Sequence, residues 1–344
     1  MDRMWTVIAA VAAFIITALL GKWLVPFLRK LNFGQTIREI GPKWHQSKQG
    51  TPVMGGLMFI IGSVITICGV SSAYFIYSYG GLNFSQSAQM QQQIQIVTGI
   101  LMAALFGAIG FVDDYIKVVK KRNLGLTGTQ KLIFQFIVAG GYLVAQYFFG
   151  KGTDTIIPFI GNVDIGIFYW IISIFLIVGL VNAVNLTDGV DGLLGSVTFF
   201  FALFFMLIAG LMQSMGAAIS AAALAGACLG FLMWNFHPAK VFMGDTGSLF
   251  LGGAVCALAF SVRMPILLLP LGLVYLMEMF SVILQVLYFK ATKGKRLFKM
   301  SPIHHHFELK GWSEIKVTVV FSMITVVMGI ASFLIVLFGG HYKL

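Results

Sequence analysis

The sequence predicts an all-α polytopic membrane protein with about ten transmembrane helices, forming one integral membrane domain over residues 1–344. Hydrophobic residues make up 58% of the chain and charged residues only 10%, whereas soluble domains carry about a quarter charged residues. At about 20 apolar residues per spanning helix, the roughly 200 hydrophobic residues supply about ten spans. The same composition excludes a disordered chain, and the continuous apolar runs disfavour a β-barrel, whose strands alternate in hydrophobicity.

Ten apolar runs mark the expected spans. They cover residues 5–27, 53–76, 94–112, 132–149, 166–184, 193–212, 216–233, 248–262, 264–288 and 317–339. The first run is too long for the core of a cleavable signal peptide, so we expect it to be retained as a span. The eighth and ninth runs are expected to meet at a tight turn formed by Arg263-Met264-Pro265.

Basic residues predict the orientation of the spans. Most of the 23 Lys and Arg residues fall in the loops after the first, third, seventh and ninth runs. The positive-inside rule therefore places these loops in the cytoplasm and both termini on the outer, periplasmic or extracellular, side. The rule also explains the formal net charge of +11 without a nucleic-acid partner. The three cysteines lie inside apolar runs, which argues against a disulfide framework.

Acidic residues collect on the same side, which the positive-inside rule does not require. Eight of the twelve do so, namely Glu39, Asp113, Asp114, Asp188, Asp191, Asp245, Glu308 and Glu314. The polar clusters that could carry chemistry share this face. We therefore expect one active site on the cytoplasmic face of the membrane.

The first polar cluster follows the third apolar run. If that run continues as a helix, one face carries Asp113, Lys117, Lys120 and Lys121. An interfacial salt bridge with snorkelling lysines is the structural alternative. Adjacent carboxylates such as Asp113 and Asp114 repel each other, however, so we favour a metal or an anionic substrate held between these acids and the lysines.

The second cluster follows the fifth run. Asn185, Asp188 and Asp191 recur every three residues, so a helix or a tight turn would present them together. Asp188 could instead be the N-cap of the sixth span. That alternative leaves Asn185, Asp191 and the neighbouring Gly189 unexplained, and glycine permits close approach of the backbone to a ligand.

Two further clusters lie near the seventh and tenth runs. The segment from Asn235 to Ser248 contains Asp245, either a helix cap or a ligand for a divalent cation, and Phe242, which could stack on a nucleobase or pack against its loop. Three consecutive histidines, His304, His305 and His306, precede the tenth run. Consecutive residues converge poorly on one tetrahedral metal, so imidazoles near a phosphate are favoured over a zinc site.

Together these segments resemble the polyprenyl-phosphate sugar-1-phosphate transferase superfamily and, within it, the phospho-N-acetylmuramoyl-pentapeptide transferase family. The matching segments, in order along nearly the whole chain, are Lys48 to Gly56, Asp113-Asp114, Lys131, Asn185 to Gly192, Asn235, Phe242 to Ser248 and Pro302 to Glu308. Relatives that transfer N-acetylglucosamine phosphate share the aspartate clusters. The uninterrupted Pro-Ile-His-His-His-Phe-Glu run favours the muramoyl-pentapeptide family, although Val190 stands where Leu is common and Val53 where Thr is common.

The resemblance implies transfer of phospho-MurNAc-pentapeptide from UDP-MurNAc-pentapeptide to undecaprenyl phosphate in the bacterial cytoplasmic membrane, giving lipid I and UMP. It also implies a requirement for Mg²⁺ and a homodimer. Asp245 would be the main magnesium ligand, Asp113 and Asp114 would serve the lipid phosphate or its proton, and His304 would be catalytic or phosphate-binding. Lys131 and Asn235 would orient phosphates. The uridine would be surrounded by Lys48, Gly189, Val190, Asp191 and Phe242. The remaining substrate-binding candidates are Lys117, Lys121, Asn185, Asp188, His305 and His306.

This chemistry needs charge compensation more than a strong base, because a phosphate monoester with a second pKa near 6 is already ionised at neutral pH. Metal and lysines would supply most of the catalysis. We favour direct attack by the lipid phosphate over an acyl-phosphate enzyme at Asp113 or Asp114. An apolar groove is expected to lead to Asp113, and Glu278, inside the ninth run, is open between function and packing.

A secondary transporter is the alternative from another class, since intramembrane acids and glycine-interrupted helices also occur there. Transporters place polar groups near the midplane, whereas the clusters here lie at span ends on one side. The nearer alternative is the sibling enzyme that transfers N-acetylglucosamine phosphate.

Overall fold

A computed structural model describes residues 2–31, 48–79, 87–120 and 124–339. Within these ranges ten helices are long and apolar enough to cross a membrane, which confirms the predicted number of spans. They are α1 (Asp2–Lys30), α2 (Gly56–Tyr79), α3 (Ser87–Val119), α4 (Gly128–Phe148), α5 (Ile167–Leu186), α6 (Leu193–Leu211), α7 (Met215–Asn235), α8 (Gly244–Ser261), α10 (Leu273–Ala291) and α12 (Glu314–Phe338).

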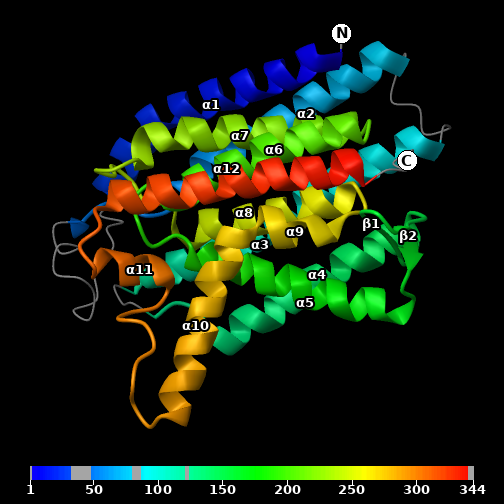
Figure 1. Cartoon of the computed structure of the whole chain (residues 1–344). Coiled ribbons are helices and arrows are strands. Elements are labelled where there is room, and N and C mark those ends of the chain that lie inside the picture. Colours follow the sequence, from blue (N-terminus) through cyan, green and yellow to red (C-terminus); the bar gives the residue numbers. More distant parts are fainter. Residues whose placement is uncertain (1, 32–47, 80–86, 121–123, 340–344) are drawn as a thin grey trace.

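Helices α7 and α8 form the centre of the bundle. Helix α7 packs against α1, α2 and α6, and α8 packs against α3 and α5 (Figure 1). The sequence of α7 is rich in alanine and glycine, and most of these residues are buried. Small side chains let helix backbones approach closely inside a membrane, where the hydrophobic effect does not drive helices together.

The ninth apolar run is not one continuous helix, contrary to the sequence prediction over residues 264–288. It begins with a 3₁₀ turn, η2 (Pro265–Leu267), and a single helical turn, α9 (Leu268–Leu271), before α10 starts at Leu273. Pro265 and Pro270 lack the backbone N–H that a helix needs, and Gly272 follows directly. In Figure 1, α10 runs at a steep angle to α12 and α7.

Other elements also differ from the prediction. A two-stranded antiparallel hairpin, β1 (Asp154–Ile157) and β2 (Gly161–Asp164), joins α4 to α5, and a short helix, α11 (Ile303–Glu308), holds the three histidines. Helix α3 continues to Val119, seven residues beyond the predicted end of its apolar run. Asp113 and Asp114 therefore belong to the last turns of a helix, as the facing pattern required.

The loops that hold the polar clusters share one end of the bundle. Figure 1 shows α11 and the turns after α5 and α7 at this end, and the β hairpin with the start of α1 at the other. The chain therefore separates its acidic and histidine clusters from its hairpin by the full length of the spans.

Close packing of α1 against α7 gives a stability prediction. A Cβ atom at Gly226 would lie 2.0 Å from the carbonyl oxygen of Ala10, so a side chain there must push the helices apart. We expect Gly226→Leu to lower the free energy of unfolding by about 1–3 kcal/mol, the usual cost of overpacking, measured by thermal unfolding in detergent. The matched control is Gly69→Leu on α2, where nothing lies within 4 Å of the added Cβ atom. Equal unfolding temperatures for the two variants would refute this account of the α1–α7 contact.

Candidate active site

Three carboxylates from two helices form the centre of the polar end. Asp113 and Asp114 lie near the end of α3, and Asp245 lies in the first turn of α8. Each offers an oxygen atom, and these oxygens all lie within 4.8 Å of one another. The helices can come this close because α3 has glycine at residue 110, where a Cβ atom would lie 2.1 Å from the carbonyl oxygen of Asp245.

Asp114 fixes the start of α8. Its carboxylate accepts hydrogen bonds from the backbone N–H of Asp245 at 3.2 Å, from the backbone N–H of Thr246 at 2.9 Å and from the Thr246 hydroxyl at 2.7 Å. The N-cap residue of α8, Met243, has no side chain that could do this. A carboxylate at a helix N-terminus satisfies free amides and opposes the helix dipole. Asp114 thus acts as a cap supplied by another helix and positions Asp245.

Two lysines connect the carboxylates. The ammonium of Lys117 lies 2.6 Å from Asp113 Oδ2 and 3.1 Å from Asp245 Oδ2, and that of Lys131 lies 3.1 Å and 2.6 Å from the same two atoms. The side chain of Asp113 is fully buried, and its other oxygen accepts from the backbone N–H of Leu126 at 2.7 Å. Asp245 is the most accessible of the three acids, with 20% of its side chain exposed.

The last turn of α5 joins this cluster through Asn185. The Asn185 side chain donates to Asp245 Oδ1 at 3.1 Å and to the Ser248 hydroxyl at 2.7 Å. Asp188 follows one turn later. Burial, and then the negative charges of Asp245, Asp114 and Asp191, raise the pKa of its carboxyl from an ordinary 3.8 to about 8. Without a bound cation, Asp188 therefore holds its proton at neutral pH.

His304, on α11, packs against the turn between α5 and α6. Its Nδ1 lies 3.0 Å from Glu278 Oε2 on α10, and both side chains are buried. A Cβ atom at Gly189 would lie 2.1 Å from His304 Nε2, so the imidazole packs directly on the glycine backbone. The sequence left the role of Glu278 open, and the structure shows it as the partner that orients His304.

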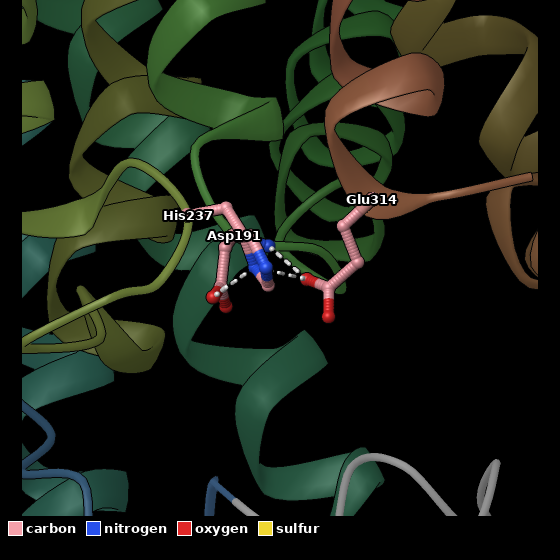
Figure 2. A group of neighbouring side chains, drawn as sticks. All are labelled: Asp191, His237 and Glu314. Atoms are coloured by element: carbon pink, nitrogen blue, oxygen red, sulfur yellow. Dashed lines mark hydrogen bonds and ion pairs between the residues drawn. The ribbon is translucent and has the colours of Figure 1, made fainter.

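A second cluster, here called the Asp191 cluster, consists of Lys48, Asp191, His237 and Glu314. The Lys48 ammonium lies 2.7 Å from Asp191 Oδ1 and 2.5 Å from Glu314 Oε2. Figure 2 shows Asp191, His237 and Glu314 pointing toward one another, with His237 Nδ1 3.2 Å from Asp191 Oδ2. Their ligand atoms could also hold a metal. Because the ammonium of Lys48 already stands between the two carboxylates, where a metal ion would lie, we favour a polar substrate-binding site over a metal site.

Sequence reasoning did not single out His237 or Glu314. His237 stood inside the third cluster without an assigned role, and Glu314 was counted only among the acids of one face. Their position in the sequence could have indicated a role, because both lie next to a spanning helix at the polar end. His237 follows α7, and Glu314 begins α12.

Asn235 and Phe242 connect loops beside the Asp191 cluster. The buried Asn235 amide donates to the carbonyl of Val241 at 2.9 Å and accepts from the backbone N–H of Gly192 at 3.1 Å. Both groups of its amide are thus engaged with the backbone. The backbone of Phe242 pairs with that of Pro52 and Gly55, and its ring is half-buried. Val190 is buried.

The three histidines of α11 do not converge on one point. His305 Nδ1 lies 2.6 Å from Glu308 Oε2, whereas His306 Nδ1 accepts from the backbone N–H of Lys299 at 3.1 Å. Partial burial, followed by the charges of Lys310 and Lys299, lowers the pKa of His306. His304 is the only one of the three that reaches Glu278 in the described residues. Lys121, predicted on the face of Asp113, lies outside the part of the chain that the structure describes.

Comparison with known proteins identifies relatives of this arrangement. Residues 96–263 match the model of Glycosyl transferase family 4. A phospho-N-acetylmuramoyl-pentapeptide-transferase of Halalkalibacterium halodurans is 47% identical over 90% of this chain and 91% of its own length. Proteins of the same name from Listeria welshimeri and Bacillus subtilis are 46% and 47% identical, over 95% and 92% of this chain and 96% and 94% of their own lengths.

The contact between Glu278 and His304 predicts how fast the backbone amides of α11 exchange with solvent. In Glu278→Ala the buried imidazole and the backbone N–H of His304 lose their acceptor, whereas the amide oxygen in Glu278→Gln can replace it. We expect hydrogen exchange of residues 303–308 to become about tenfold faster in Glu278→Ala and to stay near the wild-type rate in Glu278→Gln. Identical exchange in all three proteins would show that Glu278 does not hold α11.

The raised pKa of Asp188 predicts a pH effect on stability. Between pH 3.8 and about 8 the folded chain holds a proton at Asp188 that the unfolded chain has released. Stability from this group is therefore complete below pH 3.8 and is lost as the pH rises through about 8. In detergent without divalent cations, the unfolding temperature of the wild type should fall relative to that of Asp188→Asn over this window. A pH-independent difference would contradict the shift.

Proposed function

Because the chain belongs to the phospho-N-acetylmuramoyl-pentapeptide transferase family, we propose that it transfers phospho-MurNAc-pentapeptide from UDP-MurNAc-pentapeptide to a polyprenyl phosphate. The products would be lipid I and UMP, and undecaprenyl phosphate is the expected acceptor. The chain is a membrane-spanning phosphotransferase of peptidoglycan synthesis. The proposed chemistry rests on the cluster of Asp113, Asp114 and Asp245, in which two lysines form ion pairs with the acids.

The donor set of this cluster fits Mg²⁺. Carboxylate oxygens are the hard ligands that magnesium prefers, and those of Asp113, Asp114 and Asp245 already lie within 4.8 Å of one another. Asp245 would be the principal ligand because its carboxylate is the most accessible of the three. When bound, the ion would neutralise diphosphate charge next to the bond that breaks.

Lys117 and Lys131 would meet the phosphates. Each ammonium bridges Asp113 and Asp245, and each side chain is a quarter to a third exposed, so both can turn toward an anion at the surface of the cluster. Two polyanions must approach each other in this reaction. Fixed positive charge in a water-poor site stabilises the negative charge that develops on the departing group.

The lipid phosphate itself is the proposed nucleophile. One of its oxygens would attack the phosphorus attached to the sugar; the bond from that phosphorus to the bridging oxygen breaks, and its electron pair leaves with UMP. Asp113 is fully buried with both oxygens engaged, and both oxygens of Asp114 hold the start of α8. This engagement argues against either acid as a covalent nucleophile. Trapping labelled phospho-sugar on the protein without a lipid acceptor would overturn direct attack.

The uridine of the donor would lie at the Asp191 cluster. Lys48, Asp191, His237 and Glu314 offer charged and polar groups there, and Gly189, Val190 and the ring of Phe242 complete the proposed surface. Asn185, at the end of α5, and Asp188, in the turn that follows, would lie between this cluster and Asp245. His304, packed on Gly189, would contact the diphosphate, whereas Asn235, whose amide is engaged with the backbone of two loops, would position those loops beside it.

The polar end of the bundle would face the cytoplasm, with both termini outside, because the basic loops follow the positive-inside rule. The protein would then act in the bacterial cytoplasmic membrane, where an acceptor with a long apolar tail stays in the bilayer. We also expect an apolar groove leading to Asp113 and a homodimer, the latter from the family alone.

The decisive experiment measures UMP release by purified full-length protein. We expect release from UDP-MurNAc-pentapeptide only when both Mg²⁺ and polyprenyl phosphate are present. UDP-N-acetylglucosamine in the same assay separates this activity from that of the sibling transferases, which share the aspartate clusters. Equal turnover of the two donors, or none of the muramoyl donor, would reject the proposal.

Removing the charge of Asp245 tests its proposed role as the principal metal ligand. Asp245→Asn keeps the size of the side chain but removes its charge, so kcat should fall by about 100-fold or more, the typical loss for a group that stabilises transition-state charge. The matched control is Asp164→Asn on the β hairpin at the other end, which should keep wild-type kcat. Wild-type turnover in Asp245→Asn would exclude Asp245 as the principal ligand.

A further inference from the structure

A polar cavity lies at the end of the bundle away from the acidic cluster. It has a volume of about 230 Å³ and lies beside the β hairpin, between the first turns of α3 and the end of α4. Its polar lining residues are Gln91, Gln95, Gln146, Lys151, Asp154 and Arg263. None of these residues takes part in the proposed transfer reaction.

Lys151 contributes a cation without a carboxylate partner in the described part of the chain. Its ammonium donates to the carbonyl of Phe260 at 2.5 Å and lies 5.6 Å from the centre of the Phe260 ring. Burial, and then the charge of Arg263, lower the pKa of Lys151 to about 7. A nearby anion would stabilise the charged lysine and raise this pKa again.

Arg263 supplies a second, rigidly held cation. Its guanidinium forms an ion pair with Asp154 and donates to Asn162 Oδ1 at 3.2 Å. Its backbone has a φ of +58°, and its carbonyl accepts from the backbone N–H of Ile156 at 2.8 Å, so the hairpin fixes this residue. Arg263 Nε is buried and has no hydrogen-bond partner among the described residues. Asp154 cancels one of the two positive charges, which leaves the cavity wall with a net charge of about +1.

An apolar cavity adjoins the polar one. It opens between α2, α3, α7 and α8, and its lining includes Ile67, Ile96, Gly99, Leu224, Ala254 and Leu258. Gln95 lines both cavities, and the end of α8 contributes Leu258 to the apolar one while Arg263, just beyond it, lines the polar one. The two cavities therefore form neighbouring polar and apolar compartments along α3.

We propose that the two cavities form one binding site for a membrane phospholipid with a monoanionic phosphodiester headgroup, such as phosphatidylglycerol. The headgroup phosphate would lie at Lys151 and Arg263, and the first carbons of an acyl chain would enter the apolar cavity, which has a volume of about 50 Å³, past Gln95. The net charge of the cavity wall favours a headgroup with a single negative charge, because the wall has one uncompensated cation. The site goes beyond the proposed transfer reaction and lies at the opposite end of the spans.

Lipid retention by the full-length protein tests this site. Native mass spectrometry after extraction from mixed vesicles should show phosphatidylglycerol retained in preference to phosphatidylcholine with the same acyl chains. Lys151→Gln should reduce this retention about tenfold, since a charge-assisted hydrogen bond is lost, and Lys151→Arg should restore most of it. Retention should also weaken as the pH rises above about 7, since deprotonated Lys151 has no charge.

A matched pair of variants tests whether an acyl chain enters the apolar cavity. Ala254→Leu adds volume inside the apolar cavity and should lower phospholipid retention, whereas Val97→Leu adds volume on an exposed face of α3 and should not. All variants should keep wild-type transferase activity in detergent, which shows that they fold. Equal retention of the two lipids by the wild type, unchanged retention in Lys151→Gln or Ala254→Leu, or displacement of the lipid by inorganic phosphate would each overturn the proposal.

Discussion

The contact between the Asp114 carboxylate and the first amides of α8 is the interaction on which the polar end depends. A spanning helix leaves its first N–H groups without partners, and inside a membrane such groups are costly. Here a neighbouring helix supplies the missing acceptor. The same bonds set the position of Asp245, because it is one of the residues whose N–H is held. The hydrogen bonds that cap α8 therefore also build the candidate metal site. The glycine at residue 110 is needed because any side chain there would separate α3 from α8.

Charge compensation explains why the acids can be buried at all. Isolated carboxylates at the edge of the bilayer would be strongly disfavoured. Lys117 and Lys131 each bridge Asp113 and Asp245, and Lys48 bridges Asp191 and Glu314. Apart from Lys117 and Asp113, which lie four residues apart on α3, these pairs join segments distant in the sequence, so the packing of the spans and the neutralisation of charge depend on each other. Substrate phosphates and a cation could exchange with these internal partners without leaving a charge unpaired.

Hydropathy predicted the ten spans, and clustered polar residues predicted the loops that meet at one end. The resemblance supplied a role for nearly every candidate, yet contacts within the site needed the structure. Asp114 was expected at the lipid phosphate, and nothing in its neighbours along the chain shows that it caps α8. Glu278 could not be assigned because its partner, His304, lies on a separate short helix. The break before α10 arises from Pro270 and Gly272 inside an apolar run, where hydropathy alone shows no interruption, and the β hairpin is too short for a pattern of alternation.

The imidazole of His304 rests against the bare backbone of Gly189, which restricts the amino acids that residue 189 can accept. Any other amino acid there would place its Cβ atom against the ring, so a substitution would displace the histidine as well. A ligand that recognises the main chain of this loop would therefore contact a surface that tolerates little change in sequence. A ligand that depends on the half-exposed side chain of His237 would meet a position without that restriction.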